Sequence, residues 1–129
     1  GNVGIQGATV IVRGLATGDI QKDNLVMVVK SELSVGMLNG AIFGLLCGGL
    51  VHLTSESILH TNPILGIVVG TGIILAVCVA SLMGSLAPIL LIKLDIDPAI
   101  STGPIITVIN DIIGLAIYLA TATYLFSTL

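Results

Sequence analysis

The feature that most constrains this chain is its last apolar run, which extends from Pro98 to Leu129 and contains one charged residue, Asp111. About 20 apolar residues in a helix cross the hydrocarbon core of a bilayer, so this run is long enough to span a membrane. Asp111 lies near the middle of the run, where a short side chain reaches neither membrane surface. A carboxylate at that depth costs at least a few kcal/mol unless it meets water, a cation or a partner, which makes Asp111 a candidate functional residue.

The composition of the whole chain agrees with a membrane protein. Of the 129 residues, 55% are hydrophobic and only 9% are charged, whereas soluble domains carry about 25% charged residues. The chain has four basic and seven acidic residues and no basic cluster, which argues against nucleic acid as a partner. The composition therefore predicts an all-α, polytopic membrane helix bundle with the lipid bilayer as its surroundings.

We expect a single transmembrane domain over residues 1–129. The first eighteen residues are too short and too polar to span alone, and they suit half of a transmembrane helix. Three complete spans are expected at about 33–53, 64–92 and 98–128. Nothing at the start of the chain resembles a signal peptide, and we expect the chain to begin within a longer protein.

Small residues recur along the expected spans. In the first complete span, glycine occupies every fourth position, at Gly36, Gly40, Gly44 and Gly48. Such a stripe lets another helix approach closely, so it predicts helix packing and no chemistry. Cys47 and Cys78 lie in apolar runs without metal-ligand spacing, and we expect them to be small buried side chains.

The first half-helix carries a polar stripe. Its members follow a spacing of four, three and four residues and therefore share one helical face: Asn2, Gln6, Thr9 and Arg13. Such a face suits a helix that lines a wet pathway. The alternative is a face that hydrogen-bonds to neighbouring helices.

The four basic residues are confined to two of the expected connections. Arg13, Lys22 and Lys30 lie between the first and second expected helices, and Lys93 lies between the third and fourth. The positive-inside rule therefore places residues 19–32 and 93–97 in the cytoplasm, and residues 54–63 and the C-terminus outside a plasma or inner membrane. Glu32 lies at the expected mouth of the first complete span. It is interpreted either as a solvated helix-end carboxylate near Lys30 or as a group that attracts cations.

Other polar residues near the expected loops have structural interpretations. His52 and His60 flank one loop without a cysteine or carboxylate to complete a metal site, so interfacial histidines are favoured. Asp95 and Asp97 resemble a cation site, but Asp97 followed by Pro98 is also a good helix start, with Asp as the N-cap.

The residues around Asp111 favour a hard cation. Thr107 lies one helical turn before the carboxylate, Gly103 lies a further turn back, and Gly114 leaves room one turn ahead. Pro104 removes a backbone donor and is expected to expose a carbonyl, that of Ile100. Carboxylate, hydroxyl and carbonyl oxygens with space for water suit Mg²⁺, and the absence of His or Cys there disfavours zinc or copper. Because one carboxylate is a weak site, a symmetric homodimer that pairs two copies of Asp111 is expected.

Three stretches of this sequence resemble the membrane domain of the MgtE family of magnesium transporters and channels, which is related to solute carrier family 41. They read GNVGIQGATVIVRGLATG from residue 1, KSELSVGMLNG from residue 30, and DPAISTGPIITVINDIIGLAIY from residue 97. The resemblance covers the whole chain in order. It implies a homodimer of five-helix domains whose second and fifth helices line a cation pore. This chain would hold half of helix two and all of helices three to five, without helix one or the cytosolic regulatory domains.

The resemblance also implies roles for individual residues. Asp111 falls on the family's acidic pore residue, which binds hydrated Mg²⁺, and Thr107 and Gly103 fall on pore-facing positions. Asn2 and Gln6 match the G-N-x-G-x-Q stretch, and with Gly114 they are the expected pore-lining residues. Ile5 stands where the family commonly has a second Asn.

The sequence therefore favours a Mg²⁺ channel or transporter, with Mg²⁺ as the transported ion and Asp111, Thr107 and Gly103 at the metal site. The alternatives are a proton- or other cation-coupled transporter in which Asp111 carries a proton, and a membrane scaffold that does not conduct. An enzyme is disfavoured, because an intramembrane aspartyl protease needs two interior aspartates and this chain has one.

Overall fold

The computed structural model describes residues 2–58 and 60–129, and within them every regular element is helical. In chain order the elements are α1 (Asn2–Thr17), the 3₁₀ turn η1 (Lys22–Asn24), α2 (Leu25–Thr54), α3 (Ile64–Lys93), the 3₁₀ segment η2 (Pro98–Thr102) and α4 (Pro104–Thr128). Three of the described helices, α2, α3 and α4, are long and apolar enough to cross a membrane. The prediction of an all-α bundle with one short helix and three spanning helices is confirmed.

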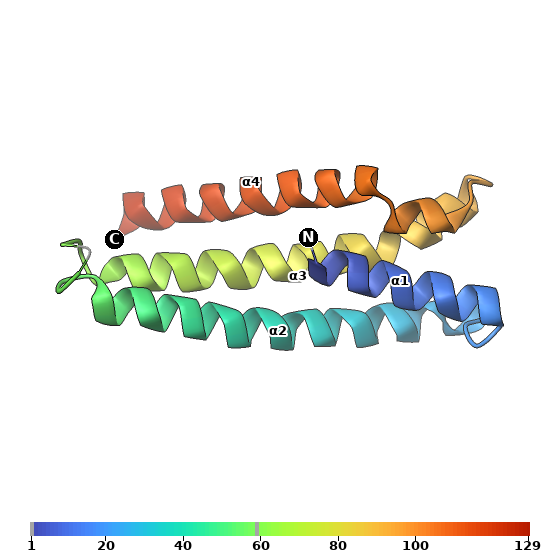
Figure 1. Cartoon of the computed structure of the whole chain (residues 1–129), viewed down its shortest axis with the longest axis horizontal. Helices are drawn as coiled ribbons and strands as arrows, with labels where there is room; N and C mark the ends of the chain where they lie inside the picture. Colours follow the sequence, from blue (N-terminus) through green and yellow to red (C-terminus); the bar gives the residue numbers. More distant parts are fainter. Residues whose placement is uncertain (1, 59) are drawn as a thin grey trace.

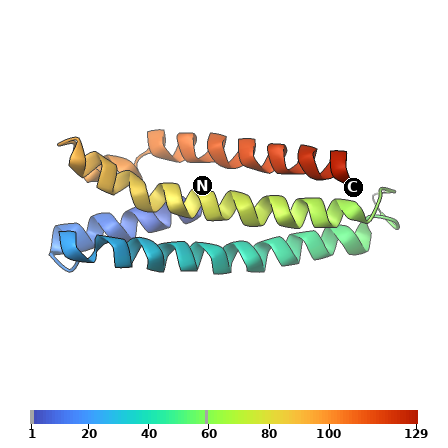
Figure 2. The same ribbon diagram turned by 180° about the vertical axis from the view of Figure 1, so that it is seen from behind.

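The helix α3 is the centre of the bundle. It lies against α2 along most of its length, against α1 near its C-terminal end, and against α4 on its other side (Figure 1 and Figure 2). The helix α1 is about half as long as its neighbours, so the N-terminus of the chain lies midway along the bundle (Figure 1). Because α4 packs mainly on α3, it buries only one residue along its length, Asn110.

The glycine stripe of α2 packs against α3, as the sequence predicted. All four glycines of the stripe are buried. A Cβ added at Gly48 would lie 2.7 Å from the carbonyl oxygen of Gly66 and 2.9 Å from Cα of Gly70, which are backbone atoms that cannot yield locally. Glycine is therefore required where the backbones of α2 and α3 come closest, and dispersion contacts between the backbones replace those of side chains.

The helix α2 starts eight residues before the span expected at 33–53. It begins at Leu25, so Lys30 and Glu32 belong to the helix rather than to a loop over 19–32. No Gly or Pro interrupts the sequence between Leu25 and Gly36, and nothing in it stops the helix from extending past the apolar core of the span.

The last expected span, 98–128, is not one continuous helix. It is a 3₁₀ segment followed by α4, and Gly103 between them has an extended backbone with ψ of 172°. The residue before a proline avoids the helical region, and Pro104 then serves as the first residue of α4. The expectation of an exposed Ile100 carbonyl was wrong, because that oxygen accepts a hydrogen bond from the Gly103 N–H at 3.0 Å. The capping role of Asp97 is confirmed, since its Oδ1 accepts from the Ala99 N–H at 3.0 Å.

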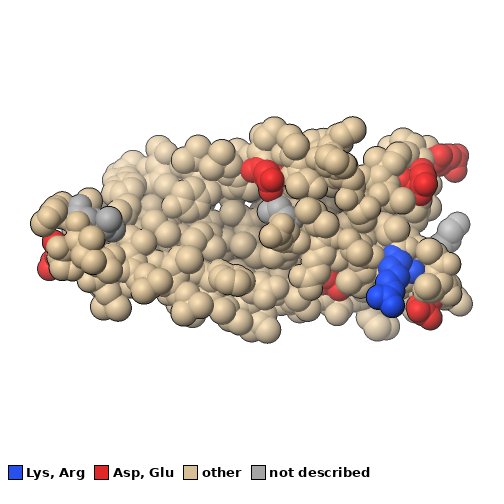
Figure 3. Space-filling model, in the orientation of Figure 1, with Lys and Arg blue, Asp and Glu red and all other residues tan. Residues whose placement is uncertain are grey.

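The helix α1 separates its small and polar residues onto two faces. The buried face consists of Gly4, Gly7, Ala8, Ile11 and Gly14. The polar stripe that contains Asn2 and Gln6 lies on the exposed face. On the face drawn in Figure 3, the Lys and Arg atoms form one blue patch, toward the end of the bundle where a turn joins α1 to α2. This clustering is compatible with the expected orientation, which stays a prediction.

Candidate functional site

Asp111 lies at a shallow hollow between α3 and α4. The hollow has a volume of about 300 Å³. Its α3 wall is apolar, and its α4 wall carries the polar groups of Asn110, Asp111 and Tyr118. Asp111 is exposed on the surface of this chain, so its carboxylate is accessible from outside the bundle. The geometry therefore offers a carboxylate beside open space in the first third of α4.

The first turn of α4 arranges oxygen atoms before Asp111. The Thr107 hydroxyl donates a hydrogen bond to the Gly103 carbonyl oxygen at 3.1 Å, and the Thr107 N–H bonds to the same oxygen at 3.3 Å. The Thr107 hydroxyl thus donates its only proton to the Gly103 carbonyl oxygen. Its lone pairs remain as acceptors for a cation or its water. Gly103 lies outside α4, and its carbonyl oxygen accepts both of these hydrogen bonds from Thr107, so its place at a metal site stays a prediction.

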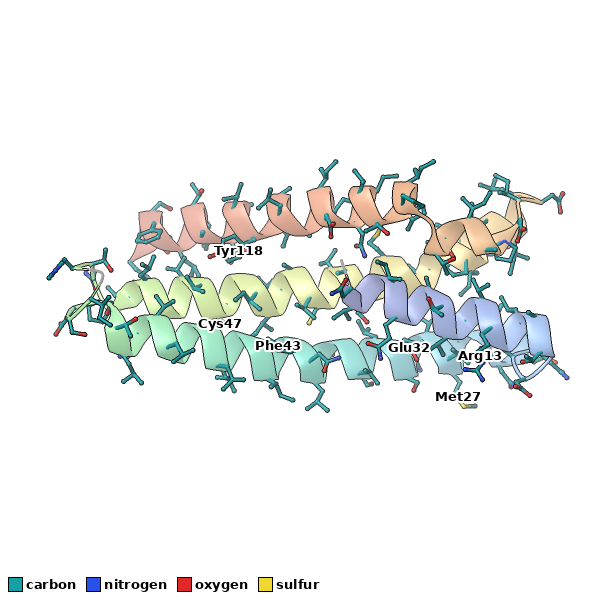
Figure 4. The ribbon with its side chains drawn as sticks, viewed as in Figure 1. Arg13, Met27, Glu32, Phe43, Cys47 and Tyr118 are labelled. Carbon is teal, nitrogen blue, oxygen red and sulfur yellow. The ribbon has the colours of Figure 1, made fainter. Side chains whose placement is uncertain are left out.

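The opposite side of Asp111 is open. A Cβ added at Gly114 would meet nothing within 4 Å, so this position leaves space next to the carboxylate. One turn further along, Tyr118 lies on the side of α4 that faces α3 (Figure 4), and its ring covers Gly72. A Cβ at Gly72 would lie 2.7 Å from the tyrosine Cδ2. Tyr118 therefore closes the far end of the hollow.

Asn110 anchors α4 to the other helices. Its side chain is 3% exposed, and its Nδ2 atom donates to the Ala80 carbonyl oxygen of α3 at 3.5 Å. The Oδ1 atom has no hydrogen-bond partner within the described part of the chain. A Cβ on Gly4 of α1 would contact Asn110 Nδ2, so three helices meet at this side chain. Asn110 thus ties α4 to α3, and the adjacent Asp111 lies at the edge of the hollow between these two helices.

Asn2 and Gln6 lie in the first turns of α1, near the junction at Asn110. Gly4 lies between them in α1 and contacts Asn110, so the first turns of α1 adjoin the turn of α4 that carries Asp111. Both side chains are exposed rather than buried between helices. Neither side chain is therefore buried against another helix of this chain, and the pore-lining role of both residues stays a prediction.

Glu32 faces α1 and not a loop. Its Oε2 would lie 3.6 Å from a Cβ on Gly7, and Figure 4 shows its side chain between α1 and α2. The Glu32 backbone carbonyl accepts a hydrogen bond from the Ser81 hydroxyl of α3 at 2.8 Å. No sequence pattern indicates this serine contact, because the partner of a hydroxyl in an apolar helix depends on how the helices pack.

No metal cluster accompanies these residues. Within residues 2–58 and 60–129, no three His, Cys, Asp or Glu side chains lie close enough to share an ion. His52 stabilises the loop between α2 and α3, because its Nδ1–H donates a hydrogen bond to the Pro63 carbonyl oxygen at 2.9 Å. A cation at Asp111 would therefore depend on water, on Thr107 and on groups from outside this chain.

A double-mutant cycle tests the contact between Gly4 of α1 and Asn110 of α4. Gly4→Ala places a methyl group against Asn110 and 2.8 Å from the Ala80 oxygen, so it is expected to destabilise the fold by about 1–3 kcal/mol. Asn110→Ala removes the larger obstacle, and in that background Gly4→Ala is expected to cost about 1 kcal/mol less. Thermal unfolding of the four purified proteins measures this coupling. Strictly additive effects would show that α1 and α4 do not meet at Asn110.

Comparisons with known proteins cover nearly the entire chain. Residues 1–121 match the family described as MgtE, divalent cation transporter. Similar relatives are proteins named magnesium transporter MgtE from Bacillus subtilis, 37% identical over 123 residues, and Thermus thermophilus, 38% identical over 125 residues. A third, from Enterococcus faecalis, is 39% identical over 118 residues. These alignments cover 95%, 97% and 92% of this chain but 26%, 26% and 25% of the relatives. The chain thus spans about a quarter of the length of the curated relatives that it matches.

Proposed function

The chain belongs to the MgtE family of divalent cation transporters, and we propose that it forms part of a Mg²⁺ channel or transporter in which Asp111 binds the hydrated ion. The observation that carries this proposal is the accessible carboxylate inside a spanning helix, in the first third of α4, beside a hollow with room for water. The curated relatives are named as magnesium transporters, which favours Mg²⁺ as the ion and a transport function over an enzymatic one.

The proposed site suits an ion that keeps its water. Mg²⁺ loses water reluctantly and is usually held by one or two carboxylates with several waters retained. The space beside Gly114 and the acceptor oxygens near Thr107 suit a hydrated ion, which needs hydrogen-bond acceptors at some distance from the metal. A membrane potential of about 100 mV would pull a divalent cation inward with roughly 4.6 kcal/mol, so the proposal needs no other energy source.

We also propose that two copies of this chain share the site. A single carboxylate balances only half of the charge on Mg²⁺, and a twofold axis would bring a second Asp111 to the same ion. The helix α4 supports this arrangement because it buries only Asn110 against its own chain and leaves the face of Asp111 accessible. The exposed Asn2 and Gln6 would then line the same pathway from α1.

In the membrane, we propose that the end with the basic residues faces the cytoplasm. Arg13, Lys30 and Lys93 lie at the end where α1 and α3 finish and α2 begins, while the turn between α2 and α3 contains no Lys or Arg. The positive-inside rule then places the α2–α3 turn and the C-terminus outside. The site at Asp111 would lie between these two surfaces.

The hydroxyl of Thr107 offers a graded test of the proposed function. Thr107→Val keeps the shape but removes an acceptor for ion-bound water, and we expect Mg²⁺ uptake by the full-length protein in liposomes to fall about two- to fivefold. Thr107→Ser keeps the hydroxyl and is the matched control, with uptake near that of the unmodified protein. Equal uptake by all three proteins would remove Thr107 from the ion pathway.

A further inference from the structure

A second, larger hollow lies where α1 ends, α2 begins and α3 ends. Figure 2 shows that these helix ends lie at the same end of the bundle. Its volume is about 650 Å³, which falls within the range of roughly 300–1,000 Å³ for pockets that bind small molecules. Among the described residues that line it, the charged side chains are Lys30 of α2 and Lys93 of α3. The remaining lining residues are apolar and come from all three helices, among them Leu15, Val29 and Ile89.

The two lysines occupy the same end of the bundle because α2 and α3 are antiparallel. Lys93 is the last residue of α3, and Lys30 lies in the second turn of α2. Both side chains are exposed, and within residues 2–58 and 60–129 neither ammonium forms an ion pair with a carboxylate. Long lysine side chains extend their ammonium groups toward the membrane surface while their methylenes remain on apolar surface. The hollow therefore combines an apolar floor with two positive charges at the level of the headgroups.

We propose that this hollow binds one anionic phospholipid. An acyl chain would lie against the apolar residues Leu15, Val29 and Ile89, and the phosphate group would lie near Lys30 and Lys93. Basic pockets between transmembrane helices bind anionic headgroups, and each lysine near the membrane surface contributes an attraction to anionic lipid. A zwitterionic lipid offsets its phosphate with its own cation, so two lysines favour a lipid with net negative charge. This proposal does not depend on which ion the protein transports.

Native mass spectrometry of the purified full-length protein with two added lipids tests the proposal. The probes are phosphatidylglycerol and phosphatidylcholine with identical acyl chains. We expect phosphatidylglycerol to bind more tightly. Lys30→Gln or Lys93→Gln should each weaken its binding about fivefold, and the double substitution about 30-fold, with little change for phosphatidylcholine.

Two further variants and one competitor test whether the hollow itself holds the lipid. Arg13→Gln removes a charge at the same end but outside the lining of the hollow, and it should leave lipid binding unchanged. Val29→Trp should fill the hollow and weaken binding of both lipids, while millimolar inorganic phosphate should displace neither. Equal binding of the two lipids, an equal loss with Arg13→Gln, or an unaffected Lys30/Lys93 double variant would overturn the proposal. So would a complete lack of bound phosphatidylglycerol, which is the result expected if another segment of the protein fills the hollow.

Discussion

Replacing Asp111 by Asn is expected to lower Mg²⁺ flux at least about tenfold. The substitution keeps the size and hydrogen-bonding capacity of the side chain but removes its charge. A carboxylate about 5 Å from a hydrated divalent ion attracts it by about 1.7 kcal/mol even at the dielectric constant of water, and by more where protein excludes water. The measurement is Mg²⁺ uptake into liposomes that contain the full-length protein.

The flux measurement needs evidence that the Asp111→Asn protein is still folded and assembled. Its mass in detergent should equal that of the unmodified protein, and the mass expected for both is that of a dimer. Unchanged flux would show that Asp111 is not the ion site. Flux that follows a proton gradient without added Mg²⁺ would favour a proton carrier, and a monomeric mass for the unmodified protein would contradict the shared axis.

Replacing Gly84 by Ala is expected to destabilise the fold by about 2 kcal/mol. A Cβ on Gly84 of α3 would contact the Gly4 carbonyl oxygen of α1 and lie 2.5 Å from the Gly4 Cα. These are backbone atoms, so α1 must move away from α3 as a whole. The cost of this overpacking is typically about 1–3 kcal/mol, and it exceeds the gain of up to about 1 kcal/mol that alanine brings to a helix. Thermal unfolding of the purified protein measures the loss.

Gly49 provides the matched control for this substitution. It lies in α2 next to the packed glycine stripe, but a Cβ added there would meet nothing within 4 Å. Gly49→Ala should therefore leave the unfolding temperature unchanged or raise it slightly. If both alanine variants unfold at the same temperature, then α1 does not pack on α3 as closely as the structure indicates.

Much of the fold could be predicted from local patterns. The apolar runs around Gly44 and Val68 are long enough to demand spanning helices, and the spacing of four glycines identifies the face of α2 that packs. The helix boundaries were less predictable. Leu25 begins α2 because nothing interrupts the helix there, and Gly103 interrupts the last run because Pro104 excludes a helical conformation before it.

The candidate site was only partly predictable for a physical reason. A carboxylate inside a long apolar run is costly wherever the helix packs, so Asp111 could be identified from the sequence alone. Its surroundings could not, because they involve residues far apart in the chain. Gly4 and Ala80 meet Asn110, Tyr118 covers Gly72, and Ser81 bonds the Glu32 carbonyl.

The amino-acid sequence by itself thus determined the membrane-spanning helices, the packing face of α2 and the identity of the charge in the last span. These properties depend on hydropathy and on spacing along one helix, which are local. The tertiary structure decided which way Asp111 faces and which hollows exist, because the burial of Asn110 sets the rotation of α4 against α3. It also brought Lys30 and Lys93 to one apolar hollow, since only the antiparallel packing of α2 and α3 unites residues so far apart in the chain.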